Sequence, residues 1–222
     1  MKFINDKKEF WIFGFGRFGQ MAATRLINNY PQALLKAIDR KDIIPDPKMP
    51  IEFICSDASN YLAENLTPHL GPSFIIPAVP FHLAYGWVKT TLQQNYHLIP
   101  IPIPDPVLHQ LPNSIPGKMG TLYSSYASFL CPDNCPEPEK VCTVTGRQRT
   151  GLLYQDYRHL NIDGYLSLGI RSYQLAPGVG GFKPEDLWGL LKKIQQTGTS
   201  IHYLLSTACL CHGVMDSFRL EE

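Results

Sequence analysis

The order of apolar and polar positions in the first half of the chain alternates between strand-like and helix-like segments. Short apolar runs predict buried strands at residues 10–13, 33–38, 51–55 and 73–80. Apolar residues at helical spacing predict helices at residues 20–30, 60–66 and 81–96. Strands that alternate with helices are typical of parallel sheets joined by right-handed crossovers. The first half is therefore expected to form an α/β domain with a Rossmann-like parallel sheet.

The pattern changes from residue 97 onward. Residues 98–106 alternate proline with aliphatic residues, which predicts a rigid connector or a fifth edge strand, because proline cannot donate to a ladder. Residues 107–126 are expected to be irregular. The chain is thus predicted to contain a Rossmann dinucleotide-binding domain at residues 1–105 and a smaller mixed α/β, cysteine-containing part at residues 106–222.

A glycine motif follows the first predicted strand. Gly14, Gly16 and Gly19 form a G-x-G-x-x-G between a strand and a helix. In a dinucleotide site these glycines allow the tight turn, the approach of a pyrophosphate and close packing of the helix. The motif predicts cofactor contacts from these glycines and from the residues between them, namely Phe15, Arg17 and Phe18.

An acidic residue supports this interpretation. Asp39 ends the second predicted strand, 20 residues after Gly19, where a Rossmann unit places an acid on the adenosine ribose. Its alternative is a solvated carboxylate at the end of a strand. Arg40 and Lys41 would suit a 2′-phosphate, so the predicted cofactor is NAD, with NADP as an alternative.

The order of these motifs resembles a known family. The glycine turn, residues 37–39 and residues 55–59 together resemble the TrkA-N or RCK-type Rossmann domain of potassium-uptake regulators, over about residues 9–96. The resemblance implies that Asp57 and Ala58 lie beside the adenine. It also implies that Ala78 and Val79 lie near the nicotinamide or the terminal phosphate.

Cysteines carry the second chemical signal. Cys131, Cys135 and Cys142 form a C-x3-C-x6-C in a proline-rich segment, which would suit zinc or an iron–sulfur cluster with a fourth ligand. That ligand is expected from Cys209, Cys211 or His212. Because the spacing matches no common structural zinc motif, ordinary thiols, a regulatory disulfide or metal-free redox cysteines are alternatives.

The charge and apolar composition of the chain indicate which kinds of partner to expect. The chain has 20 Lys and Arg against 19 Asp and Glu, without a basic stripe, so neither nucleic acid nor an anionic membrane is indicated. No apolar run reaches the roughly 20 residues that a membrane helix needs, and no signal peptide is recognised. We therefore expect a cytoplasmic protein that binds a dinucleotide, with a homodimer, a transporter or a redox protein as possible partners.

Three functions agree with these patterns. The first is an NAD(H)-binding module that couples nucleotide binding to a cysteine-ligated metal or redox centre. The second is an NAD(P)-dependent oxidoreductase with its substrate between the two parts. The third, which depends on the resemblance, is a regulatory subunit of a potassium transporter. No catalytic constellation is readable from the sequence.

Overall fold

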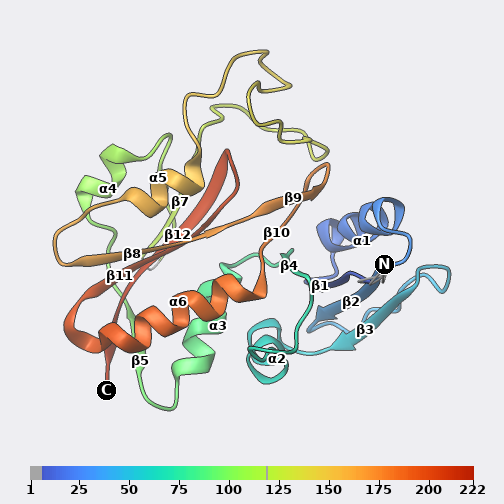
Figure 1. Cartoon of the computed structure of the whole chain (residues 1–222), viewed down its shortest axis with the longest axis horizontal. Helices are drawn as coiled ribbons and strands as arrows, with labels where there is room; N and C mark the ends of the chain where they lie inside the picture. The colour runs from blue at the N-terminus through green and yellow to red at the C-terminus, as the bar shows by residue number, and fades with distance from the viewer. Residues whose placement is uncertain (1–6, 119) are drawn as a thin grey trace, which may run out of the picture.

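Two β-sheets organise the computed structural model, which describes residues 7–118 and 120–222 (Figure 1). The first sheet has the strand order β3-β2-β1-β4, and each of its strand pairs is parallel. This order is that of one half of a Rossmann sheet. The α/β class with a Rossmann-like parallel sheet is therefore confirmed.

The first sheet and its helices follow the predicted order. They are β1 (Glu9–Phe13), α1 (Arg17–Asn29), β2 (Leu34–Asp39), β3 (Ile51–Cys55), α2 (Ala58–Asn65), β4 (Phe74–Pro77) and α3 (Leu83–Leu92). The strands form because their aromatic and β-branched residues are buried, as in β1, where Phe10 and Ile12 are fully buried. Helix α1 packs on this sheet through Ala22, Ala23 and Leu26.

The second sheet is mixed and has six strands, in the order β6-β7-β12-β11-β8, with β5 also paired to β12. Its elements are β5 (His97–Pro100), α4 (Asp105–Gln110), β6 (Ile115–Pro116), β7 (Thr121–Ser125), α5 (Leu153–His159), β8 (Tyr165–Arg171), α6 (Pro184–Thr197), a 3₁₀ turn (Gly198–Ser200), β11 (His202–Ala208) and β12 (His212–Glu221). Strand β8 runs parallel to β11, whereas β12 is antiparallel to its neighbours.

Two sequence predictions need correction here. Residues 107–126 are not irregular throughout, because most of α4 and the strands β6 and β7 lie within them. The predicted fifth strand is found as β5, which includes residues 98–100, but it pairs with β12 of the second sheet instead of extending the first, and the Ile101 amide still donates to the Ser217 carbonyl of β12. Both errors have one cause: short strands are stabilised by partners that are distant in the sequence and leave little local pattern.

A hairpin joins the two sheets. Strands β9 (Tyr173–Ala176) and β10 (Val179–Gly181) follow directly after β8 and reach the free edge of β4 (Figure 1). There, Ile75 and Phe182 exchange backbone hydrogen bonds of 2.9 and 3.0 Å. The edge strand of the first sheet is thereby covered by the second half of the chain.

The largest hydrophobic core also spans both sheets. It combines Phe13 and Ile75 of the first sheet with Tyr203 and Phe218 of the second, and helices α3 and α6 contribute Trp87, Leu187, Leu190, Leu191 and Ile194. Helix α3 and strand β5 lie before residue 105 in the chain yet share this core or the second sheet. The division at residue 105 stays a prediction.

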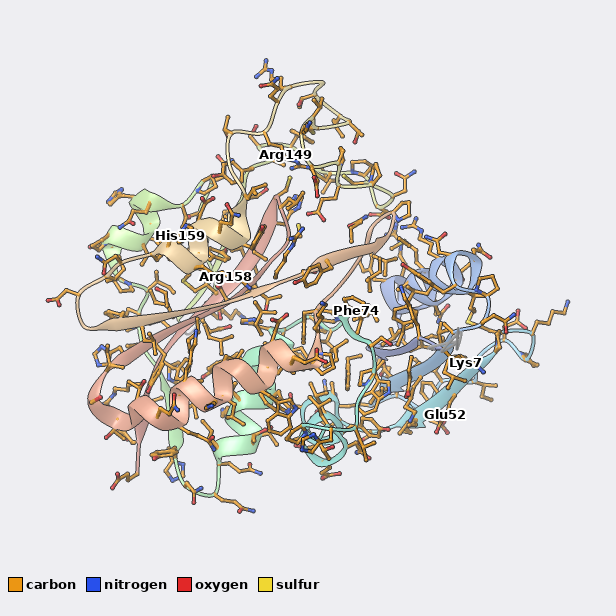
Figure 2. All side chains as sticks on the ribbon, in the orientation of Figure 1. Lys7, Glu52, Phe74, Arg149, Arg158 and His159 are labelled. Carbon is orange, nitrogen blue, oxygen red and sulfur yellow. The ribbon has the colours of Figure 1, made fainter. Side chains whose placement is uncertain are left out.

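Residues 127–152, between β7 and α5, form no helix or named strand and project away from both sheets (Figures 1 and 2). This segment contains Cys131, Cys135 and Cys142. In the part of the chain that the structure describes, no helix is both long enough and apolar enough to cross a membrane.

Candidate functional site

The glycine turn lies at the carboxyl end of the first sheet, between β2 and β4. Gly14 has φ +91°, and its amide donates to the Ile38 carbonyl at 2.7 Å. A Cβ atom on Gly14 would lie 2.5 Å from the Ala78 carbonyl oxygen, and one on Gly19 would lie 1.9 Å from the Gly14 oxygen. The fold itself therefore requires glycine at both positions.

Gly16 differs from the other two glycines. It has φ −73°, which any residue adopts, and a Cβ atom there would meet nothing within 4 Å. It is exposed at the N-cap of α1, where no side chain caps the helix. Nothing in the fold requires glycine at this position, and the space beside it is open to an anion at the helix N-terminus.

The residues between the glycines have separate roles. The side chain of Phe15 is buried against Phe53, so only its backbone lies at the turn. Phe18 is 52% exposed and borders a cavity, whereas the Arg17 guanidinium forms an exposed ion pair with Asp133.

Asp39 holds the glycine turn in place. One carboxylate oxygen accepts a 2.7 Å hydrogen bond from the Phe15 amide, and the other accepts one of 2.9 Å from the Lys41 amide. Each oxygen keeps a further acceptor position, which a ribose hydroxyl would be able to use. Arg40 is exposed beside it.

The remaining predicted nucleotide contacts lie at the same end of the sheet. Asp57 is the N-cap of α2, where its carboxylate accepts from the amides of Ser59 and Asn60, and Ala58 is buried. A structural role thus accounts for Asp57. Ala78 and Val79 border a cavity of 440 Å³, together with residues 178–180 of the β9–β10 hairpin.

Side chains of α1 connect the glycine turn to the cysteine segment. Arg25 donates to the carbonyl oxygens of Asp133 and Pro177, at 2.6 and 2.7 Å. The Gly178 amide in turn donates to the Cys135 carbonyl at 2.8 Å. These contacts position Cys131 and Cys135 near the carboxyl end of the first sheet.

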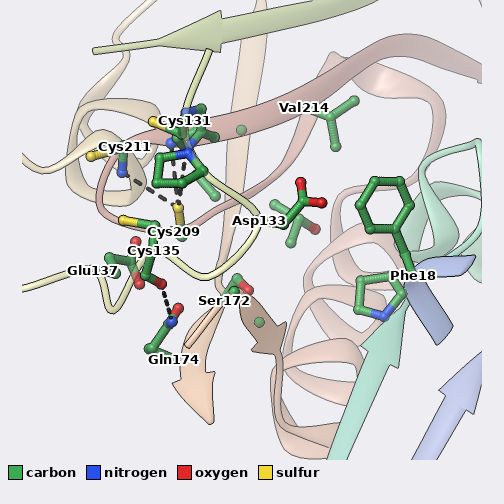
Figure 3. A pocket seen from close by; sticks show the side chains of 18 of the residues that line it. Phe18, Cys131, Asp133, Cys135, Glu137, Ser172, Gln174, Cys209, Cys211 and Val214 are labelled. Carbon is green, nitrogen blue, oxygen red and sulfur yellow. Dashed lines mark hydrogen bonds between the residues drawn. The ribbon is translucent and has the colours of Figure 1, made fainter. Parts of the chain in front are cut away.

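Four thiols border one cavity of 250 Å³. They belong to Cys131, Cys135, Cys142 and Cys211, and the lining also includes Arg147 and Arg149. Figure 3 shows Cys131, Cys135, Cys209 and Cys211 close together, with Phe18 on the opposite side of the neighbouring pocket. The predicted association of the C-x3-C-x6-C segment with the C-terminal cysteines is thus found, through Cys211 of the β11–β12 turn.

The surroundings of these thiols differ. Hydrogen bonds from the Thr145 amide and hydroxyl and from the Val144 amide lower the pKa of the Cys142 thiol. Burial raises the pKa of Cys131, and the neighbouring thiols of Cys135, Cys211 and Cys142 raise it further. Burial also raises the pKa of Cys211, although the Arg149 guanidinium, which donates to its sulfur, opposes that shift.

Cys209 and His212 do not border the four-thiol cavity. The Cys209 sulfur accepts from the amides of Cys211 and His212, at 3.4 and 3.3 Å, and burial together with the Glu137 carboxylate raises its pKa. His212 is exposed, with Nδ1 3.9 Å from the Cys209 sulfur. Both residues border the larger cavity instead.

The thiols do not converge on a single point. Within residues 7–118 and 120–222, no group of three or more His, Cys, Asp or Glu side chains is gathered closely enough to hold one metal ion. The donor set nevertheless suits a soft metal, because thiolates are the preferred ligands of zinc and of iron–sulfur clusters.

One cavity lies between the glycine turn and the cysteine segment. It measures 480 Å³, and its lining includes Phe18, Met21 and Pro77 from the first half of the chain and Cys131, Cys135 and Cys211 from the second. Pro77 also borders the 440 Å³ cavity beside Ala78 and a third cavity of 310 Å³. The carboxyl end of β4 is therefore the meeting point of three adjoining cavities.

The 310 Å³ cavity contains a histidine for which the sequence indicated no chemistry. His82 is buried, with Nδ1 2.7 Å from Asp216 Oδ2 and Nε2 2.8 Å from Thr207 Oγ1. The hydroxyl of Thr121 donates to the other Asp216 oxygen at 2.6 Å. Thr207 borders both this cavity and the 480 Å³ cavity, so its hydroxyl links the buried pair to the cleft.

Sequence reasoning missed this trio because His82 lies more than 100 residues from the other two members. Thr207 is 125 residues from His82 and Asp216 is 134 residues from it. One signal was present. Asp216 is a charged residue in a strand-like stretch of β12 that also contains Val214, Met215 and Phe218, and such a residue needs a partner when it is buried.

Comparisons with known proteins place most of the chain in one family. Residues 84–221 match the family model AF_1314_C, described as "Uncharacterized protein, C-terminal domain". A protein from Archaeoglobus fulgidus, also described as an uncharacterized protein, is 25% identical over 152 residues, which cover 67% of this chain and 66% of the relative. No solved structure matches the chain.

The predicted resemblance to the TrkA-N or RCK-type domain was wrong. The matched family model is a different one, and it overlaps residues 9–96 only from residue 84 onward. A glycine turn followed by a strand-end acid is shared by many α/β sheets, so these motifs were too general to identify that family. The roles carried over to Asp57, Ala58, Ala78 and Val79 lose this support.

The match to the AF_1314_C model extends over more than half of the sequence, and the chain belongs to the AF_1314_C family.

Proposed function

We propose that the protein binds a nicotinamide dinucleotide at the glycine turn and couples this binding to a metal or redox centre held by cysteines. The observation that carries the proposal is the 480 Å³ cavity, which has Phe18 and Met21 of α1 on one side and Cys131, Cys135 and Cys211 on the other. Its volume lies in the range of small-molecule sites. A nucleotide at the glycine turn would extend toward these thiols.

Three features of the turn support a dinucleotide. Gly16 leaves open space at the N-terminus of a 13-residue helix. Asp39 keeps free acceptor positions at the end of β2. The strand order β3-β2-β1-β4 places both of them at the carboxyl edge, where open α/β sheets bind nucleotides.

Isothermal titration calorimetry with NAD⁺, NADH, NADPH and ATP tests the proposal. Wild-type protein should bind a nicotinamide dinucleotide, and Gly16→Asp should abolish binding, because a carboxylate would then occupy the place of the pyrophosphate. Gly189→Asp is the matched control, since Gly189 is an exposed helical glycine with open space around it and borders none of the cavities described above. Absence of binding by the wild type, or equal binding by Gly16→Asp, would contradict the proposal.

A second candidate function is an NAD(P)-dependent oxidoreductase, which His82 favours. A bound nicotinamide would supply or accept a hydride, and the reaction would also need a proton donor or acceptor. Asp216 orients the His82 ring through Nδ1, and Nε2 shares a hydrogen bond with the Thr207 hydroxyl at the edge of the cleft. This chain is suited to passing a proton between Nε2 and a substrate oxygen through Thr207 Oγ1.

This second function has its own test. Oxidation of NADH by a panel of aldehydes, ketones and 2-oxo acids should be detectable with the wild type and lost in His82→Asn. The dinucleotide affinity of His82→Asn should remain within about twofold of the wild type, because that residue does not border the glycine turn. NADH binding without turnover on any carbonyl would favour the binding module instead. The potassium-transporter alternative depended on the corrected resemblance and has no other support.

A further inference from the structure

The four-thiol cavity allows the kind of cysteine-ligated centre to be specified. Cys131, Cys135, Cys142 and Cys211 come from two segments that are distant in the sequence, and all of them border the same 250 Å³ space. Cys135 belongs to a backbone network that also fixes the β9–β10 hairpin, through hydrogen bonds from Gly178 and Gln174 to its carbonyl. The fold thus positions the loop whether or not the thiols bind anything.

We propose that these four cysteines bind an iron–sulfur cluster and that Cys209 is not one of its ligands. This inference rests on the proposed function, whose cysteine-ligated centre it specifies. One feature of the structure favours a cluster over a single metal ion. Another feature separates the four proposed ligands from Cys209.

The arrangement of the thiols favours a cluster over a single zinc ion. Four thiolates on one zinc must all lie about 2.3 Å from the same point. In residues 7–118 and 120–222 no group of three such side chains is gathered closely enough to hold one ion, and the four cysteines border a cavity of 250 Å³, which is much larger than one ion. In a cluster each thiolate binds its own iron or shares one with a single other thiolate, so the ligands lie around a volume rather than a point.

The electrostatic surroundings also suit a cluster with four thiolate ligands. Arg147 and Arg149 border the cavity, and Arg149 donates to the Cys211 sulfur and, at 2.6 Å, to the Pro138 carbonyl. Hydrogen bonds to the sulfurs and nearby cations stabilise thiolates. The cavity therefore already holds positive charge and donors where ligand sulfurs would carry negative charge.

Cys209 is excluded by its position. It borders the 480 Å³ cavity but not the four-thiol cavity, although only one residue separates it from Cys211. Its sulfur accepts from two backbone amides within its own turn, and the Glu137 carboxylate lies beside it. These two hydrogen bonds hold the Cys209 sulfur within its own turn.

Anaerobic reconstitution with ferrous iron and sulfide tests the inference. The full-length wild type should take up iron and acid-labile sulfide in equal amounts, about two or four of each per chain, with the visible absorption of a cluster. Each of Cys131→Ala, Cys135→Ala, Cys142→Ala and Cys211→Ala should lose most of the iron and sulfide. Cys209→Ala, and Cys55→Ala in the first sheet, should keep them.

Several results would overturn the inference. These are one zinc per chain without sulfide when zinc competes with iron, no metal uptake at all, or a loss of iron in Cys209→Ala as large as in the four ligand variants. Circular dichroism and thermal unfolding of every variant separate loss of a ligand from loss of the fold. NADH titration of the same proteins keeps the two proposals apart: a wild type that holds the cluster but binds no NADH supports the cluster alone, whereas a wild type that binds NADH but takes up no iron supports the dinucleotide site alone.

Discussion

His82 Nδ1 lies 2.7 Å from Asp216 Oδ2, although 134 residues separate these two side chains in the chain. Both are buried, and the pair connects the start of α3, just after the first sheet, to the central strand of the second sheet. A buried ion pair or hydrogen-bonded pair of this kind is costly to break from one side, because the remaining partner is left without compensation.

Replacing Asp216 should therefore change the titration of Tyr85, a nearby buried tyrosine. Burial raises the pKa of Tyr85 to about 12, and the charge of Asp216 adds to that shift. Asp216→Asn keeps the shape but removes the charge, so the pKa of Tyr85 should fall while remaining above its ordinary value. Tyrosinate absorbance titration of Asp216→Asn, with Tyr85→Phe to identify the signal, measures this change. An unchanged titration would contradict this interaction between Asp216 and Tyr85.

Gly16 and Gly19 should respond in opposite ways to substitution. Gly19→Ala would place a methyl group 1.9 Å from the Gly14 oxygen and should destabilise the fold by about 1–3 kcal/mol. Gly16→Asp meets no atom and supplies an N-cap to α1, so it should raise the free energy of unfolding by a few tenths of a kcal/mol. Urea denaturation of both variants measures the contrast. Marked destabilisation by Gly16→Asp would show that the space beside Gly16 is not open.

The two arginines of α1 that reach the cysteine segment should contribute unequally. Arg25 donates to two carbonyl oxygens, and Arg25→Ala should cost about 1–2 kcal/mol and speed proteolysis within residues 127–152. Arg17 makes an ion pair whose arginine side chain is 77% exposed, so Arg17→Ala should cost less than about 1 kcal/mol. Limited proteolysis followed by mass spectrometry compares them. Equal cleavage rates in both variants would contradict this difference.

Buried tyrosines should make the fold sensitive to alkali. Burial raises the pKa of Tyr157 to about 12, and its side chain is almost completely buried. Below about pH 10 both the folded and the unfolded states keep this proton, so the full stability is present. Between about pH 10 and pH 12 the unfolded state loses the proton first, and the free energy of unfolding should fall by about 1.4 kcal/mol per pH unit.

Tyr157→Phe tests this dependence, because it keeps the ring and removes the ionisable group. Its free energy of unfolding, measured by urea denaturation across the alkaline range, should fall less steeply than that of the wild type. Tyr123→Phe is the control, since Tyr123 is 48% exposed, and it should leave the slope unchanged. Identical slopes in all three proteins would assign the alkaline sensitivity to other groups.

The sequence by itself determined the local features of this protein. Short apolar runs found the strands of the first sheet, and apolar residues at helical spacing found its helices, because each pattern reflects the surface that an element buries. The G-x-G-x-x-G located a turn whose Gly14 and Gly19 the backbone requires. It did not identify the family, since the same local geometry occurs in many α/β proteins.

Only the tertiary structure decided how distant residues meet. It brought Cys211 together with Cys131, Cys135 and Cys142 on one cavity that Cys209 does not border, although Cys209 and Cys211 both border the 480 Å³ cavity. It brought His82 to Asp216 and Thr207, and it placed the glycine turn and the thiols on one cavity. Sequence spacing carries no record of such contacts, because they depend on how two sheets pack around a shared core.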